Sequence, residues 1–169
     1  GTLRIITNKP DPSKFSGSVD VSGNQFKDGN GGGTFEGYVN FPLSDHSAVR
    51  LVGYYDHSGG YISNIPGQLT YQRTDVDGLK PDPITVNNSA LVKNNFNDSD
   101  TYGGRLAFKY DFNDTWSIMP SVLAQNQQSN GAYFYDPKVG DLKNQNYRPD
   151  YANDHWYQTA LVVQGTIGN

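Results

Sequence analysis

The chain has 169 residues, with 13 Lys and Arg against 17 Asp and Glu, so its formal net charge is −4. This acidic balance excludes a broad nucleic-acid-binding surface, which needs clustered Lys and Arg, and the lack of cysteine excludes disulfides and thiol chemistry. Gly, Pro, Asn and Asp make up more than a third of the chain and Glu occurs once, at Glu36. Because such residues favour turns over helices, an all-α fold is excluded, and an aromatic content of 13% excludes a disordered linker.

Six segments alternate between apolar and polar residues with the period of two that β-strands show. In chain order they are 15–23, 34–41, 48–56, 102–112, 116–124 and 157–167. The fourth is the clearest, because Leu106 and Phe108 share a face with other apolar residues and glycine, while Arg105 lies on the opposite face. The last two alternate less clearly, and Pro120 cannot donate a hydrogen bond to a neighbouring strand. The sequence therefore predicts an all-β fold of about six antiparallel strands.

The connections between these strands differ in length. Short turns around 44–46 and 113–115 follow the second and fourth strands, whereas long loops of about 57–100 and 126–154 follow the third and fifth. A compact soluble domain rarely carries two structureless loops of this length. A transmembrane β-barrel has short turns at one end and long loops at the other. The pattern therefore favours a segment of an antiparallel transmembrane β-barrel.

Aromatic residues near both ends of the strands also fit a membrane barrel. Those beside the short turns are Phe41, Phe112 and Trp116, and those beside the long loops are Tyr55, Tyr102, Trp156 and Tyr157. Two such belts are typical of the two membrane–water interfaces. A strand of eleven residues tilted by about 40° rises roughly 28 Å, enough to cross the apolar band. The best apolar run, 160–163, is far shorter than the roughly 18–20 residues of a spanning helix.

The N-terminal residues carry a more specific signal. The segment Gly1–Asp11, GTLRIITNKPD, closely resembles the strand that closes the plug of TonB-dependent outer-membrane receptors, where Gly-x-Ile-x-Ile-Ile-Thr-x-x-Pro precedes the first barrel strand. Leu3 in place of Ile departs mildly from that pattern. A second stretch, 48–55 followed by 59–62, looks like an early barrel strand that enters an extracellular loop. The resemblance implies that 1–11 ends the plug domain and that 12–169 forms the N-terminal part of the barrel.

The same resemblance implies a location in the bacterial outer membrane, with the loops 57–100 and 126–154 outside the cell. Receptors of this family bind a scarce solute and import it into the periplasm when the TonB energy-coupling protein acts on the plug. The implied partners are the solute, the lipid bilayer and the TonB protein, with no cofactor and no nucleic acid. Six strands cannot close a membrane barrel, because small barrels use eight and plugged transporters 22. We therefore expect a fragment that is inactive without its own plug and the remaining strands.

Residues for catalysis or metal binding do not fall into a recognisable pattern. His46, His57 and His155 are isolated, and none forms a pair with metal-ligand spacing. The stretch 98–109 begins like a calcium loop but has Lys where the twelfth position requires Glu. We therefore expect neither an enzyme nor a metal site.

Aromatic residues in the long loops are the best candidates for contact with a solute. We assign substrate binding to Tyr61, Tyr71, Tyr133 and Tyr135, because rings like these stack on sugars or on planar chelates. The sequence does not choose between a siderophore–iron chelate and an oligosaccharide as the solute.

Strand alternation places three cations, Arg50, Arg105 and Lys109, on the lumen side of the predicted barrel, where they could pair with plug carboxylates. An anionic iron chelate would suit these arginines, and a glycan would suit the Tyr- and Asn-rich loops. The alternative to a transporter is a soluble carbohydrate-binding β-sandwich module, which would share the same loop composition. A surface adhesin or barrel enzyme would share the membrane location, but it should lack the plug-closing strand that 3–7 resembles.

Overall fold

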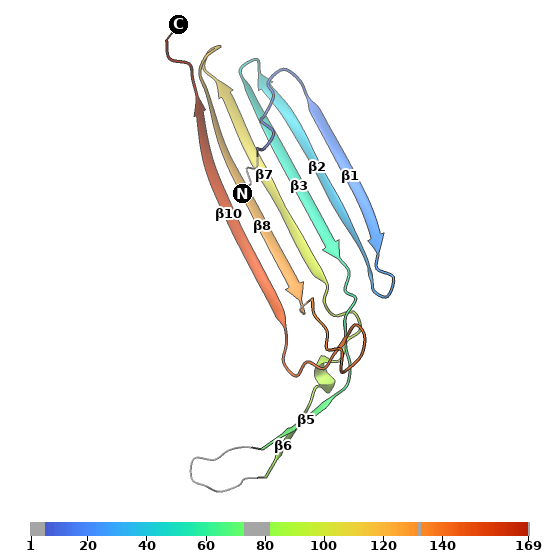
Figure 1. Ribbon diagram of the computed structural model, residues 1–169. Helices are drawn as coiled ribbons and strands as arrows, with labels where there is room; N and C mark the ends of the chain where they lie inside the picture. The colour runs from blue at the N-terminus through green and yellow to red at the C-terminus, as the bar shows by residue number, and fades with distance from the viewer. Residues whose placement is uncertain (1–5, 73–81, 132, 169) are drawn as a thin grey trace, which may run out of the picture.

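The computed structural model describes residues 6–72, 82–131 and 133–168, and it is dominated by one antiparallel sheet (Figure 1). Its strands are β1 (Ser16–Gln25), β2 (Gly31–Ser44), β3 (Ser47–Ser58), β7 (Ser99–Asp111), β8 (Ser117–Asn130) and β10 (Tyr151–Gln164). They lie side by side in chain order and each pairs antiparallel with its neighbours. The predicted all-β fold of six antiparallel strands is thereby confirmed, and the sheet is open rather than closed.

The connections divide the sheet into two ends, which we call the turn end and the loop end (Figure 1). At the turn end, the hydroxyl groups of Ser44 and Ser47 lie 2.7 Å apart across the turn between β2 and β3. In the turn between β7 and β8, the Asn113 side-chain oxygen accepts hydrogen bonds from the backbone N–H groups of Thr115 and Trp116. Side chains that bond to their own turn explain why so few residues reverse the chain at both places. No helix in the described part of the chain is both long and apolar enough to cross a membrane.

At the loop end, two strands extend further than the sequence predicted. Strand β8 continues to Asn130 and β10 begins at Tyr151, and these two residues pair directly. The stretch 125–130 is polar throughout, so it shows no alternation although it belongs to the ladder. As a result Trp156 and Tyr157 lie within β10 rather than beside the loop, and Trp156 pairs with Gln125 on the opposite face from Tyr157. Tyr157 nevertheless lies on the same face as Tyr55 and Tyr102 and within two residues of their level in the sheet, so the predicted aromatic belt is wrong at Trp156 alone.

The long loops are not structureless. They contain β4 (Ser63–Asn64), β5 (Gln68–Tyr71), β6 (Ile84–Asn87), the 3₁₀ helix η1 (Ser89–Leu91) and β9 (Lys143–Asn144). Strands β5 and β6 form a hairpin that projects from the loop end (Figure 1). The short parallel pair β4–β9 joins the two loops. The tip of this hairpin, 73–81, lies outside the described residues.

Buried asparagines order the two long loops, where one of them bonds to both loops and the other three bond within their own loop. They are Asn64, Asn88, Asn97 and Asn144. The Asn64 amide, for example, donates to the Leu91 carbonyl oxygen at 2.8 Å and accepts from the Asn146 backbone N–H at 2.7 Å. An amide side chain offers both a donor and an acceptor, so it replaces a backbone partner where a strand ladder ends. This is how Asn-rich loops become ordered without a large apolar core.

The ladder between β7 and β8 is interrupted at Pro120. Pairing runs as far as Ala107 with Ser121 and resumes at Tyr110 with Ile118, in the same register. Proline has no backbone N–H, so the gap follows directly from its chemistry. On its other side Pro120 still pairs with Leu161 of β10. Pro120 therefore interrupts the pairing of β8 with β7 without changing the register of the strand.

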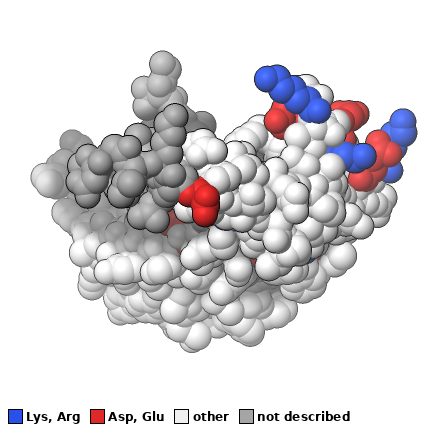
Figure 2. All heavy atoms as spheres, turned by 90° about the horizontal axis from the view of Figure 1, so that it is seen from below, with Lys and Arg blue, Asp and Glu red and all other residues white. Residues whose placement is uncertain are grey.

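The sheet exposes apolar side chains on one face and buries polar side chains on the other, the reverse of the arrangement in a soluble protein. One face, which we call the apolar face, exposes large apolar side chains on all six strands: Val19, Val21, Phe35, Leu51, Tyr55, Tyr102, Leu106, Tyr110, Val122, Tyr157, Leu161 and Val163. The other, the polar face, buries Asn40 completely and leaves Arg50 and Arg105 only 8% exposed. Figure 2, a view of the loop end, shows most charged side chains gathered at the upper right and a broad uncharged surface below.

A tyrosine covers a glycine on the polar face. The Tyr54 hydroxyl donates to the Gln125 side-chain oxygen at 2.6 Å, and a Cβ atom added at Gly103 would lie 2.6 Å from that hydroxyl oxygen. The ring therefore crosses β7, which lies between β3 and β8 in the sheet. Only glycine allows this close approach.

Replacing Gly103 by Ala is therefore expected to displace the Tyr54 ring and to destabilise the fold by about 1–3 kcal/mol, the usual cost of overpacking. Denaturant unfolding measures this loss. Gly53→Ala is the matched control, because a Cβ atom there meets nothing within 4 Å, and its effect should stay within about 0.5 kcal/mol. Equal stabilities for the two variants would contradict the assigned role of Gly103.

Candidate functional site

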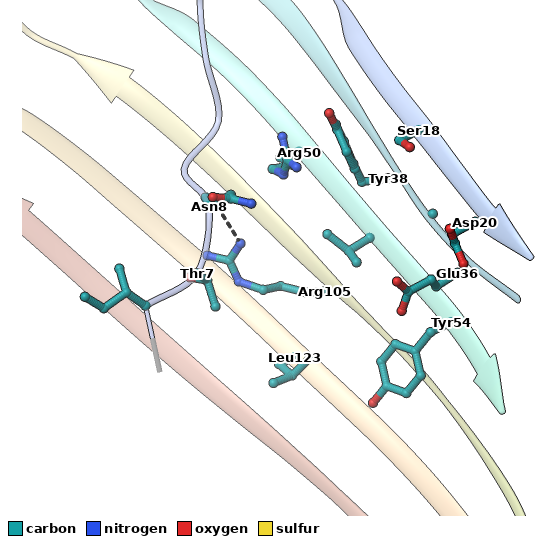
Figure 3. A pocket seen from close by; sticks show the side chains of 13 residues that line it. Thr7, Asn8, Ser18, Asp20, Glu36, Tyr38, Arg50, Tyr54, Arg105 and Leu123 are labelled. Atoms are coloured by element: carbon teal, nitrogen blue, oxygen red, sulfur yellow. Dashed lines mark hydrogen bonds between the residues drawn. The ribbon is translucent and has the colours of Figure 1, made fainter. Parts of the chain in front are cut away.

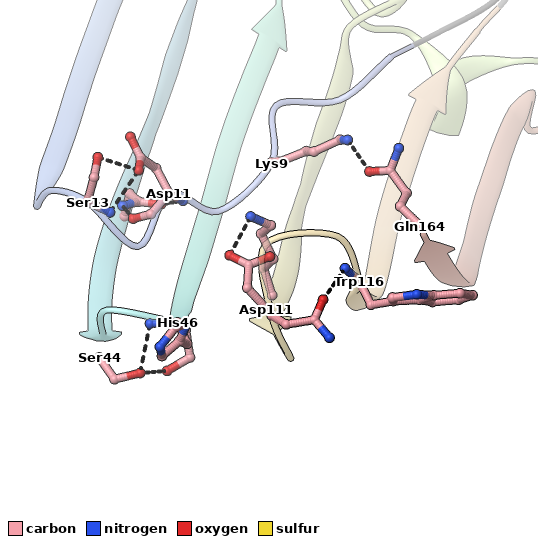
Figure 4. Close-up of polar contacts among 12 residues, drawn as sticks. Lys9, Asp11, Ser13, Ser44, His46, Asp111, Trp116 and Gln164 are labelled. Atoms are coloured by element: carbon pink, nitrogen blue, oxygen red, sulfur yellow. Dashed lines mark hydrogen bonds and ion pairs between the residues drawn. The ribbon is translucent and has the colours of Figure 1, made fainter. Parts of the chain in front are cut away.

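The N-terminal segment, residues 6–15, crosses the polar face near the turn end (Figures 1 and 4). Its main anchor is Asn40, whose side chain lies fully buried on β2. The Asn40 oxygen accepts a hydrogen bond from the Asp11 N–H at 2.9 Å, and its amide nitrogen donates to the carbonyl oxygens of Asp11 at 2.9 Å and Lys14 at 2.8 Å. Three directional bonds from one side chain thus clamp the chain where it enters β1.

The clamped turn is closed by the Asp11 carboxylate. It accepts hydrogen bonds from the Ser13 hydroxyl at 2.6 Å and the Ser13 backbone N–H at 2.8 Å. These bonds favour the charged form and lower the pKa of Asp11 below its ordinary value, with the hydroxyl bond as the largest cause. A lowered pKa in the folded state means that the turn is strongest above the unfolded pKa and weakens as the pH falls through the folded one.

Two further bonds hold the segment on the same face, toward the β10 edge of the sheet. The Arg105 guanidinium on β7 donates to the Asn8 carbonyl oxygen at 3.2 Å, and the Lys9 ammonium donates to the Gln164 side-chain oxygen of β10 at 2.5 Å (Figure 4). Pro10, between Lys9 and the clamped Asp11, is buried. The segment is therefore attached to strands from β2 to β10 rather than resting on one strand.

A cavity of about 600 Å³ lies between the start of this segment and the polar face (Figure 3). Its walls come from β1, β2, β3, β7 and β8 together with residues 6–8. The polar side chains that line it are Thr7, Asn8, Ser18, Asp20, Glu36, Tyr38, Arg50, Tyr54 and Arg105. This volume falls in the range of small-molecule sites.

Charges within the cavity are separated rather than paired. The Arg50 guanidinium stacks on the Tyr38 ring, 3.6 Å from its centre, and Asp20 pairs across the strands with Glu36. Among the described residues, the ion pairs join His57 to Asp100, Lys93 to Asp98 and Lys109 to Asp111, so none involves either arginine. Lys109, predicted with the arginines to face the lumen, is thus the one of the three that already has a carboxylate, at 2.7 Å.

The four tyrosines assigned to substrate binding lie in different parts of the loop end. Tyr61 stacks on Phe26 at 5.1 Å between ring centres, and Tyr71 is exposed on the β5–β6 hairpin. Tyr133 and Tyr135 are exposed in the loop before β10, where the Tyr133 hydroxyl donates to Ser99 at 3.4 Å. None of the four lines the cavity on the polar face.

The arrangement can bind a polar solute. In the described part of the chain, no three His, Cys, Asp or Glu side chains gather as they would around a metal ion. The cavity instead combines two cations, two carboxylates and aromatic rings, which can orient a polar solute by hydrogen bonds, charge and stacking.

Sequence reasoning placed Arg50 and Arg105 on the correct face but missed Asn40. An asparagine inside an otherwise alternating strand is a weak signal by itself, and its partners lie 26 and 29 residues away in the chain. The plug-like motif is only partly visible, because Gly1–Ile5 lies outside the described residues. Comparisons with models of known families, with curated proteins and with solved structures find no match to this chain.

Proposed function

We propose that this chain is part of a TonB-dependent receptor of the bacterial outer membrane, which binds a scarce solute and imports it into the periplasm. The observation that carries the proposal is the inverted sheet, which exposes leucines and valines on one face and buries arginines on the other. Soluble monomers rarely expose a contiguous apolar patch larger than a few hundred Å². In a lipid bilayer the acyl chains would cover the apolar face, and the polar face would line the lumen.

Strand length and connectivity support a barrel wall. The six long strands contain 10 to 14 residues, and a membrane-spanning strand needs about 9–11. Short turns at one end and long loops at the other match the periplasmic and extracellular ends of such barrels. With residues 6–15 entering β1 at the turn end, the loops face outside the cell.

The open edges of the sheet support further strands as partners. Strands β1 and β10 each pair with a single neighbour among the described residues. An unpaired strand edge leaves backbone N–H and C=O groups without hydrogen bonds, which costs several kcal/mol per group in lipid. Additional strands would close the barrel, and a plug would fill the lumen where residues 6–15 are already bound.

The rival function, a soluble carbohydrate-binding sandwich, fits the sheet less well. A sandwich covers its apolar face with a second sheet about 10 Å away. In the described residues the additional strand pairs, β4–β9 and β5–β6, belong to the loops at the loop end (Figure 1). These short strands leave the apolar face of the large sheet exposed, and the proposal rests on that exposure.

The test is to find the native polypeptide that carries this sequence, using peptide-specific detection in fractionated bacterial membranes. We expect an outer-membrane band, much larger than 18.7 kDa, that shifts in mobility on heating as closed barrels do. Peptides from the periplasmic TonB partner should crosslink to the same band. A soluble species of 18.7 kDa would overturn the proposal and support the sandwich.

A further inference from the structure

We propose that Asn40 is a positioning residue for import, which fixes residues 10–14 to the barrel wall so that movement of the plug ends at Lys9. The inference rests on the proposed function, because it takes the load on residues 6–9 to come from the plug. The N-terminal segment makes different contacts on the two sides of the Lys9–Pro10 bond. This contrast locates the point at which a displaced chain would stay attached.

On the C-terminal side of that bond, several hydrogen bonds hold the chain at one place. The Asn40 side chain bonds to the N–H and the carbonyl oxygen of Asp11 and to the carbonyl oxygen of Lys14, at 2.9, 2.9 and 2.8 Å. The Ser13 N–H and hydroxyl group donate to the Asp11 carboxylate (Figure 4). These bonds share one side chain and one turn, so detaching the chain requires them to break together.

On the N-terminal side, the attachment is weaker. In the described part of the chain, Asn8 and Lys9 each make one hydrogen bond to a side chain of the sheet. Residues 6–9 are exposed, whereas Pro10 is buried. Separate bonds at exposed positions can break one at a time, because water can replace each of them. Contacts that the plug would add to residues 6–9 would move with the plug, so they would not hold these residues to the wall.

The backbone around the clamp is also stiff. Pro10 and Pro12 flank Asp11 in the sequence. Proline fixes its own φ and restricts the residue before it to extended conformations. The turn therefore forms at a small cost in chain entropy, and few backbone rotations would let it follow a displaced segment.

The position of the clamp in the sheet shows which strand it would protect. Asn40 pairs with Ser16, and this is the first pair of the β1–β2 ladder at the turn end. A load on the N-terminal side would reach this pair first and would open the ladder one pair after another. Because Asn40 also holds Asp11 and Lys14, the load passes into β2 before it reaches the ladder. The clamp therefore lets the plug move without pulling β1 out of the barrel.

A single-molecule force experiment, pulling on the N-terminus of the complete receptor in a lipid bilayer, tests this role. We expect the wild type to release the plug and residues 6–9 first, and β1 only in a separate event at higher force. In Asn40→Ala the first release should be longer by residues 10–25, roughly 55 Å of extended chain. Asn40→Asp should behave like Asn40→Ala at neutral pH and regain the separate event at acidic pH, where its carboxyl group can donate a hydrogen bond.

Gly103→Ala is the matched control, because it is expected to destabilise the sheet without removing a bond of the clamp, and it should keep the two separate events. If Asn40→Ala keeps them as well, Asn40 does not fix the chain against a load. If Gly103→Ala loses them, general destabilisation accounts for the effect. Heat-modifiable mobility of each variant, measured in parallel, shows whether a closed barrel is present, so failure of this inference is distinguishable from failure of the proposed receptor.

Discussion

Replacing Leu106 by Arg is expected to destabilise the protein in a lipid bilayer by about 2–4 kcal/mol, the cost of a cation near the midplane of a barrel wall. Leu106 is 45% exposed in the middle of the apolar face, opposite Leu51 and Val122. On the surface of a soluble protein a substitution at such an exposed residue would change stability by no more than about 0.5 kcal/mol. Urea unfolding in lipid vesicles measures the difference.

Gln158→Arg is the matched control for this experiment. Gln158 is exposed on β10 and pairs with Leu123, which lines the cavity, so its side chain lies on the polar face. An arginine there would face water in the lumen and should leave stability within about 0.5 kcal/mol of the wild type. If the two variants lose equal stability, the apolar face does not contact lipid.

Replacing Asn40 by Ala is expected to destabilise the fold by about 2–4 kcal/mol. The substitution leaves the N–H of Asp11 and the carbonyl oxygens of Asp11 and Lys14 without their partner. A fully buried group left unpaired costs about 1–3 kcal/mol, and water recovers part of that cost at these half-buried positions. Residues 6–14 should then become sensitive to proteases while the six-stranded sheet persists. Unfolding curves and limited proteolysis together measure both effects.

Asn40→Asp separates the hydrogen bonds from the shape of the side chain. Its carboxylate would still accept from the Asp11 N–H, but it would face two carbonyl oxygens that now receive a hydrogen bond. A charged carboxylate against these oxygens is unfavourable, so the variant should recover stability as the pH is lowered and the protonated carboxyl group supplies an O–H donor. Asn126→Ala, at an exposed position of β8, should be neutral. A pH-independent loss in Asn40→Asp would contradict the clamp.

Period-two alternation was enough to predict that six strands form and, in the first four of them, which face each residue occupies. Leu106 and Arg105, for example, lie on opposite faces in the structure as their positions require. Alternation fails where both faces are polar, as in Gln125–Asn130, because water covers both sides there and no apolar stripe is needed. The ends of β8 and β10 therefore could not be predicted, and neither could the ordered elements inside the long loops.

The candidate functional site could likewise be predicted only in part from the sequence. The sequence by itself determined that Arg50, Arg105 and Lys109 share one face of an all-β sheet, since this depends only on neighbours along each strand. Only the tertiary structure decided that both arginines line a cavity beside residues 6–8 and that Asn40 clamps Asp11, whereas Lys109 and Asp111 are neighbours on one face of a single strand. The physical reason is that burial and hydrogen bonding depend on which distant segment covers a side chain. Residues 6–15 cross several strands of the sheet, and alternation along a single strand does not predict those contacts.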